Sequence, residues 1–197
     1  MINKIKLNAK QILERFYFLK GPLYFVIILL LAHFAWRYSF EEDIDLSGNL
    51  MLFLWGMDVT NFFNSVSITL TKSVYILLNN ILGIDVGMFD NTIFSKESHA
   101  VINIVWSCSG IKQMFVFFCI IAFYPGSSLR KLWYVPSGLI VIAILNIIRI
   151  AMITYGTKIN GAWFDPLHEI SKYVFYGIIF LMWVIWEEKI RKHEPHA

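Results

Sequence analysis

Three side chains that can perform covalent and proton-transfer chemistry lie in the second half of this 197-residue chain. Cys108 lies in "WSCSG", at the beginning of an apolar run. Arg149 lies inside the apolar run "ILNIIRIAMI", and His168 lies in "DPLHEIS", just before another. A thiolate attacks carbonyls, a guanidinium stabilises an oxyanion, and an imidazole exchanges protons near neutral pH. Brought together, the three residues could support acyl transfer.

The sequence around Cys108 is open to two interpretations. A cysteine is commonly a small buried hydrophobe, and this reading also suits Cys119. Ser107 and Ser109, however, are good helix caps, so Cys108 is predicted to begin a helix whose free N–H groups favour the thiolate and could hold an oxyanion. Gly110 permits close backbone approach. The two cysteines are too far apart on one helix, about 16 Å, for a disulfide, so two free thiols are expected.

Arg149 is unusual because it interrupts a long apolar segment. Placing such a charge in a membrane helix costs roughly 2.5–3.5 kcal/mol on insertion scales, so arginines there are usually paired or functional. Asn146, three residues earlier, is on the same helix face and could orient the guanidinium. The alternative is that Arg149 extends toward a nearby membrane interface without any other role.

His168 is predicted to lie at a loop-to-helix junction. It could be a structural interfacial residue, or an acid and base oriented by Asp165 or Glu169. His99, close to Cys108 in sequence, is the second candidate for the base. No HExxH, paired CxxC, carboxylate cluster or phosphate-binding loop occurs. We therefore expect neither a metal nor a cofactor.

The composition places these residues in a membrane protein. Hydrophobic residues make up 57% of the chain and charged residues only 16%, which is too apolar for an ordinary soluble domain. We predict an all-α integral membrane protein in one domain, a polytopic helical bundle of four to six spans with an interfacial helix and a short extended outer loop. The first 20 residues hold five basic residues and one acidic residue, a charge pattern that suits anionic lipid rather than nucleic acid.

Charge and hydropathy together predict the topology. The basic N-terminus is expected to be an uncleaved cytoplasmic anchor, and Arg130 and Lys131 mark a cytoplasmic loop. Arg149 is sixteen residues beyond Trp133, about 24 Å along a helix, so it reaches the outer interface, as do Cys108 and His168. The predicted segments are a basic cytoplasmic segment (1–21), a first span (22–40), a short hairpin or interfacial helix (49–84), an outer loop (85–107), a three-span core (108–186) and a cytoplasmic tail (187–197).

These motifs, in this order, resemble the exosortase/archaeosortase family of membrane cysteine transpeptidases. The family has Cys-Ser-Gly at the entrance of one span, Asn-x-x-Arg in the next and His at a later one. They match Cys108-Ser109-Gly110, Asn146-Ile147-Ile148-Arg149 and His168. The upstream stretch "ILLNNILGIDVGMFDNTI" is also similar to the segment before the family's cysteine. The resemblance covers about residues 65–186 and is to the compact bacterial exosortases.

The resemblance implies a cysteine protease or transpeptidase that cleaves C-terminal sorting signals of exported proteins through a thioacyl-enzyme. It implies Cys108, Arg149 and His168 as catalytic residues, with oxyanion or orienting support from Ser109, Gly110 and Asn146. The implied substrates end in a short motif, a transmembrane helix and a basic tail. The acceptor would be water or an amine or hydroxyl of a lipid or glycan. The expected location is the cytoplasmic (inner) membrane, with the site facing the periplasm.

Two other classes of function remain compatible with the residues. A non-catalytic membrane scaffold or accessory protein for protein or exopolysaccharide export would use the polar residues as hydrogen bonds between helices. A transporter could use Arg149 to bind an anion, but broken helices in two related halves are expected of such a fold, and no internal repeat is found.

Overall fold

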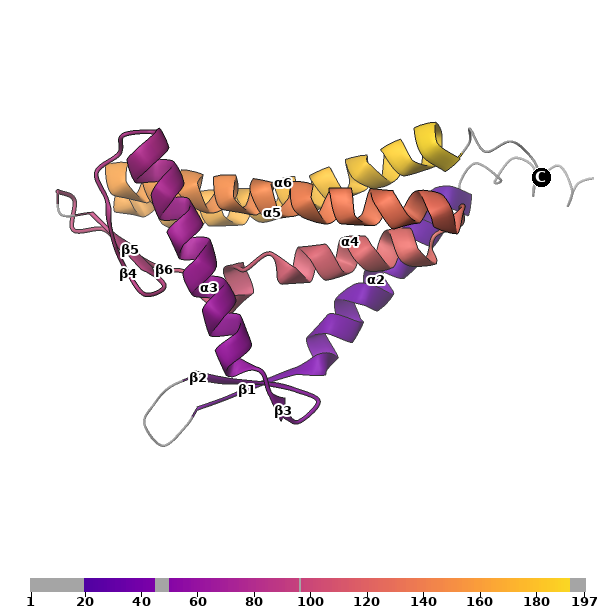
Figure 1. The fold of residues 1–197 in the computed structure, drawn as a ribbon, viewed down its shortest axis with the longest axis horizontal. Helices are drawn as coiled ribbons and strands as arrows, with labels where there is room; N and C mark the ends of the chain where they lie inside the picture. The colour runs from indigo at the N-terminus through magenta and orange to yellow at the C-terminus, as the bar shows by residue number, and fades with distance from the viewer. Residues whose placement is uncertain (1–19, 45–49, 96, 192–197) are drawn as a thin grey trace, which may run out of the picture.

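The computed structural model describes residues 20–44, 50–95 and 97–191, and five α-helices dominate this part of the chain (Figure 1). The α-helices are α2 (Lys20–Ser39), α3 (Thr60–Tyr75), α4 (Ile111–Phe123), α5 (Ser128–Ile159) and α6 (Phe164–Ile185). π-Helical turns extend α3 and α6, as η2 (Ile76–Ile81) and η5 (Trp186–Arg191). Short 3₁₀ turns precede α4 and α6, as η3 (Trp106–Cys108) and η4 (Gly161–Trp163).

Two small antiparallel sheets accompany the helices. One contains β1 (Phe40–Ile44), β2 (Leu50–Leu54) and β3 (Met57–Asp58), and the other contains β4 (Gly87–Phe89), β5 (Thr92–Phe94) and β6 (Val101–Asn103). The second sheet falls in the region predicted to be extended, whereas the first replaces part of a stretch that the sequence left ambiguous. The predicted all-α membrane class is confirmed, with these strands as additions.

Three helices of the described residues are long and apolar enough to cross a membrane: Lys20–Ser39, Ser128–Ile159 and Gly161–Ile190. The fourth apolar helix, α4, has only 13 residues, whereas roughly 20 are needed to span the hydrocarbon. It is short because Gly110 begins it with a φ of +80° and Pro125 follows its end, where Tyr124 is already extended. The described residues therefore contain three helices of spanning length and the shorter α4, against a prediction of four to six spans, and the described residues between 50 and 84 supply no further span.

The helices α2, α4, α5 and α6 share one hydrophobic core, which includes Phe25, Phe117, Ile142 and Ile179. A Cβ at Gly138 would lie 2.3 Å from the ring of Phe117, so this glycine permits α4 and α5 to approach closely. The Tyr134 hydroxyl donates a 2.7 Å hydrogen bond to the carbonyl of Met182 and joins α5 to α6. These contacts fix the half of the bundle farthest from the sheets.

The second half of α5 is covered by α3 and the β4–β6 sheet. Val74, Leu78, Ile93, Ile104 and Ile150 form a separate core between them. Because this core holds α5 against the strand that leads into "WSCSG", it places the cysteine segment beside the second half of α5.

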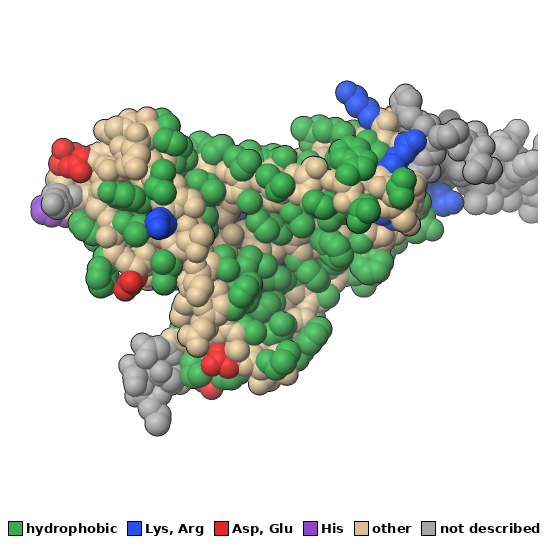
Figure 2. Space-filling view, in the orientation of Figure 1, with side chains coloured by type: hydrophobic (Ala, Val, Ile, Leu, Met, Phe, Trp, Pro, Cys, Tyr) green, Lys and Arg blue, Asp and Glu red, His purple; other side chains and the backbone are tan. Residues whose placement is uncertain are grey.

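Hydrophobic and charged side chains are distributed unevenly over the surface. In Figure 2 a broad hydrophobic surface covers the helices, Lys and Arg gather where α4 joins α5, and Asp and Glu lie toward the end with the sheets. This segregation of charge along the bundle resembles that of proteins whose basic end faces the cytoplasm.

Candidate active site

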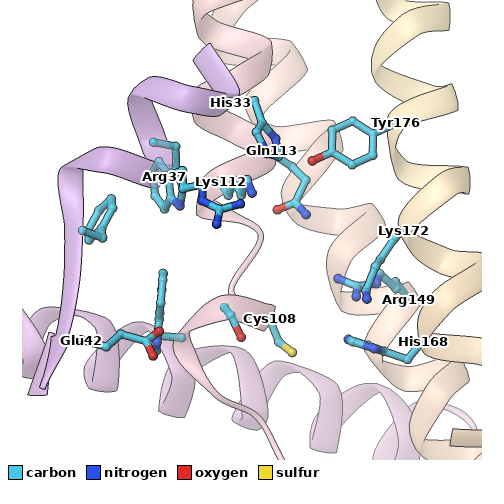
Figure 3. A pocket seen from close by; sticks show the side chains of 14 residues that line it. His33, Arg37, Glu42, Cys108, Lys112, Gln113, Arg149, His168, Lys172 and Tyr176 are labelled. Carbon is cyan, nitrogen blue, oxygen red and sulfur yellow. The ribbon is translucent and has the colours of Figure 1, made fainter. Parts of the chain in front are cut away.

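Cys108, Arg149 and His168 all line a single pocket of about 610 Å³. Figure 3 shows the sulfur of Cys108 directed toward the wall that carries Arg149 and His168. That wall is built by α5 and α6, and the facing wall is built by α2 and the first turn of α4. Three residues that are spread over 60 positions of the sequence therefore line one cavity.

The cysteine lies in η3, one turn before α4, and not at the beginning of a helix as predicted. The N–H of Cys108 donates to the carbonyl of Val105 at 2.9 Å, and that of Ser109 donates to Trp106 at 3.0 Å. These two N–H groups are already paired, so they do not form the expected oxyanion site. Ser109 Oγ accepts a 3.3 Å hydrogen bond from the N–H of Ile111, whereas Ser107 makes no capping hydrogen bond.

Gly110 explains why this turn and α4 stay separate. Its φ of +80° is the left-handed region that favours glycine. A Cβ at this position would lie 2.9 Å from the side-chain amide of Asn146, closer than ordinary contact. The Cys-Ser-Gly sequence therefore lets the cysteine turn pack directly on α5.

Arg149 is buried, with only 6% of its surface exposed. Its Nε donates to Ser171 Oγ at 2.9 Å and its Nη1 donates to Asn146 Oδ1 at 3.4 Å. The guanidinium also lies 5.8 Å from the ring centre of Phe175. Within the described residues no carboxylate pairs with it, and part of its charge faces the pocket.

A continuous chain of hydrogen bonds joins the three predicted residues. Asn146 Nδ2 donates to the carbonyl of Cys108 at 2.9 Å, and its Oδ1 accepts from Arg149. Arg149 reaches Ser171, whose hydroxyl donates to the carbonyl of His168 at 2.8 Å. Asn146, which was predicted to orient the guanidinium, contacts both Arg149 and the backbone of Cys108.

His168 lies within α6 instead of at the junction before it. The helix begins earlier than expected because Asn160 Oδ1 accepts from the N–H of Ala162 at 3.0 Å and Pro166 is tolerated in a first turn. The imidazole stacks on Phe164, with ring centres 5.7 Å apart. In the part of the chain that is described, neither Asp165 nor Glu169 bonds to this ring, and Glu169 pairs with Lys172 at 3.2 Å.

Several residues of the pocket were not identified from the sequence. The most important of them is Ser171. In the series of hydrogen bonds described above, it connects Arg149 with the backbone of His168. His33 and Trp36 of α2 line the pocket, and Trp36 also packs on Phe115, with ring centres 5.5 Å apart. The remaining polar lining residues are Arg37, Glu42, Lys112, Gln113, Lys172 and Tyr176. The sequence did offer one signal for them. Polar residues recur every four positions along α2 and α6, which places them on one face of each helix.

The second candidate base is excluded by position. His99 lies in a turn near the β4–β6 sheet and does not line the pocket. Among residues 20–44, 50–95 and 97–191, no group of three His, Cys, Asp or Glu residues could hold a metal ion. Both cysteines are free. The pocket lining includes a thiol, two imidazoles, four cations and one carboxylate.

Fold and site together describe a helical membrane protein with a thiol, a buried guanidinium and an imidazole in one pocket. The chain belongs to the transmembrane exosortase family, whose model matches residues 11–185. The resemblance inferred from the motifs is confirmed. No curated protein and no solved structure matches the chain.

Proposed function

We propose that the protein is a membrane cysteine protease or transpeptidase that cleaves C-terminal sorting signals of exported proteins through a thioacyl-enzyme. The observation that carries the proposal is the chain of hydrogen bonds from Cys108 through Asn146, Arg149 and Ser171 to His168. It fixes the cysteine turn and α6 relative to one buried cation. Such fixed geometry is what acyl transfer requires, because the reacting groups must be held before the substrate arrives.

The first step transfers the acyl group to the enzyme. His168 takes the thiol proton, and the sulfur of Cys108 attacks the scissile carbonyl carbon. The peptide C–N bond then breaks, the leaving amine takes the proton from His168, and a thioester remains. Membrane anchoring of the substrate's C-terminal helix beside the bundle delivers its motif to the pocket.

The second step releases the acyl group to an acceptor. Water, or an amine or hydroxyl on a lipid or glycan, gives its proton to His168 and attacks the thioester carbonyl. The C–S bond breaks and the thiolate returns. The product is an acid, an amide or an ester according to the acceptor.

Arg149 is suited to hold the negative oxygen that forms in both steps. A guanidinium has five N–H donors, and Asn146 and Ser171 occupy two of them. The remaining donors are held in a plane of fixed orientation, and burial strengthens their interaction with a developing anion. Arg149 therefore takes the role first expected of the backbone N–H groups near Cys108.

The proposed location is the inner membrane, with the pocket at its periplasmic side. Support comes from Arg130 and Lys131 at the beginning of α5, the end opposite to the pocket, since cytoplasmic loops are enriched in basic residues. Both termini would then be cytoplasmic, although their basic and tail segments lie mostly outside the described residues.

Cleavage of a tailed substrate tests the nucleophile. Cys108→Ala should leave a co-expressed protein with a C-terminal motif, membrane helix and basic tail uncleaved, as measured by its size on an immunoblot. Cys119→Ala is the matched control, because Cys119 lies in the core of the bundle and should retain cleavage. Full processing by Cys108→Ala with normal membrane insertion would refute the proposed nucleophile.

Thiol reactivity separates this proposal from a non-catalytic scaffold. Cys108 is partly exposed to the pocket, whereas Cys119 is 7% exposed. A membrane-impermeant maleimide should label Cys108 faster than Cys119 from the periplasmic side. Equal and slow labelling of both thiols would favour packing roles for the two cysteines and a scaffold function.

A further inference from the structure

The wall of the pocket opposite Arg149 and His168 carries two cations, Arg37 and Lys112. Arg37 at the end of α2 and Lys112 at the beginning of α4 both line the cavity, and His33 lies one turn from Arg37. Among the described residues, neither the Arg37 side chain nor the Lys112 side chain makes a hydrogen bond or an ion pair. The full lining has four Lys or Arg residues and one carboxylate, Glu42.

Arg37 and Lys112 carry like charges that no ion pair among the described residues offsets. Arg37 is close enough to Lys112 for their charges to repel each other, and Figure 3 shows both side chains directed into the cavity. Lys112 is half-buried, so water screens it only partly. An anionic group bound between the two would remove the repulsion and pair with both cations.

The surroundings of the two cations indicate which anion fits. Arg37 lies in the last turn of a membrane-length helix, at the level where lipid head groups are expected. Its neighbours on α2 include Phe34 and Tyr38, which are 48% and 77% exposed, and Tyr173 beside Lys172 on α6 is 75% exposed. A cationic lining with exposed apolar flanks matches an amphiphile that has an anionic head and hydrocarbon chains.

We propose that Arg37 and Lys112 form a subsite for the phosphate of an anionic membrane lipid, which places the lipid head group beside Cys108. Lipid binding at this subsite does not depend on catalysis. The role of the lipid as the acyl acceptor rests on the proposed function. A head-group hydroxyl would attack the thioester carbonyl, giving its proton to His168. An ester forms, the C–S bond breaks and Cys108 is restored as the thiolate.

Native mass spectrometry of the full chain released from detergent measures this binding. Dihexanoylphosphatidylglycerol should bind saturably, and dihexanoylglycerol, which has similar chains and no phosphate, about tenfold more weakly or worse. Arg37→Gln and Lys112→Gln should each weaken the phospholipid about tenfold, the effect of losing one charge-assisted contact. Lys72→Gln is the matched control, since Lys72 is an exposed lysine of α3 outside the pocket lining, and it should bind normally.

Competitors identify the recognised group. Displacement of the lipid by inorganic phosphate shows that phosphate itself is bound, whereas resistance to displacement, with the same loss in both variants, assigns the site to lipid-borne phosphate. Equal affinity for the two lipids, normal affinity in both variants, or displacement only by a short glutamate-containing peptide would overturn the proposal. Because Cys108→Ala should bind the lipid normally, failure of binding and failure of cleavage are separate results.

Discussion

The two walls of the pocket differ in how their charges are satisfied. On the α5–α6 wall, Arg149 is 6% exposed, and it donates hydrogen bonds to Ser171 and Asn146. On the α2–α4 wall, Arg37 is exposed and Lys112 half-buried, and neither pairs with another described residue. On one wall the cation is held by protein acceptors, and on the other the described residues form no ion pair with Arg37 or Lys112.

This difference matches two requirements of the transpeptidase function proposed above. Groups that stabilise a transition state must be fixed in advance, because reorganising them during the reaction costs rate. Groups that bind a mobile acceptor can instead stay available to solvent until it arrives. The partnered wall therefore suits the chemical step and the unpartnered wall suits ligand capture.

Replacing an arginine by lysine should have the most different effects on the two walls. Arg149→Lys keeps the charge but cannot donate to both Asn146 and Ser171 while facing the pocket, so cleavage of the tailed substrate should fall about a hundredfold. Arg37→Lys keeps the charge at an exposed position, and the affinity for phosphatidylglycerol should change by about threefold or less. Substrate cleavage rates and native mass spectrometry measure the two effects.

The reverse pattern would break the comparison. Normal cleavage by Arg149→Lys would show that charge alone matters on the α5–α6 wall. Loss of lipid binding in Arg37→Lys would show that the α2–α4 wall also depends on the geometry of a guanidinium.

Gly110→Ala tests how far the partnered wall depends on backbone conformation. The left-handed φ of +80° costs an alanine roughly 1–2 kcal/mol, and its Cβ would press on the Asn146 amide at 2.9 Å. We expect lower thermal stability in detergent and about a tenfold loss of cleavage. Gly177→Ala is the matched control in α6, where a Cβ has no contact within 4 Å, and it should be neutral or slightly stabilising. Equal behaviour of the two variants would remove the role assigned to Gly110.

The motifs of the partnered wall could be predicted from the sequence because their residues break local patterns. An arginine in an apolar run is conspicuous, and Asn146 at three residues' distance shares its helix face. The membrane class and the family followed from hydropathy and from the order of the same motifs. Ser171 gave no such signal, since a serine near the beginning of a helix is ordinary and its contact with Arg149 crosses between two helices.

The unpartnered wall was missed for a related reason. Arg37 stands at the end of the first apolar segment, where arginines are common, so its sequence context does not indicate that it lines a site. Its approach to Lys112 depends on how α2 packs against α4, which hydropathy does not determine. The position of Cys108 before α4 was also hidden, because the separate 3₁₀ turn depends on Gly110 meeting Asn146 from another helix.

Ser171→Ala is the mildest test of the partnered wall. It removes the acceptor of Arg149 Nε and leaves the contact with Asn146, so the guanidinium keeps one of its two supports. Loss of one such hydrogen bond should lower the cleavage rate about fivefold without altering lipid affinity. Ser137→Ala, which removes a hydroxyl bonded only to the carbonyl of Trp133 on an exposed face of α5, should leave both unchanged. Because a small residual motion of Arg149 affects the transition state more than the bound substrate, the loss should appear in kcat and not in KM. A change in KM alone would instead make Ser171 a residue that shapes the pocket for the substrate.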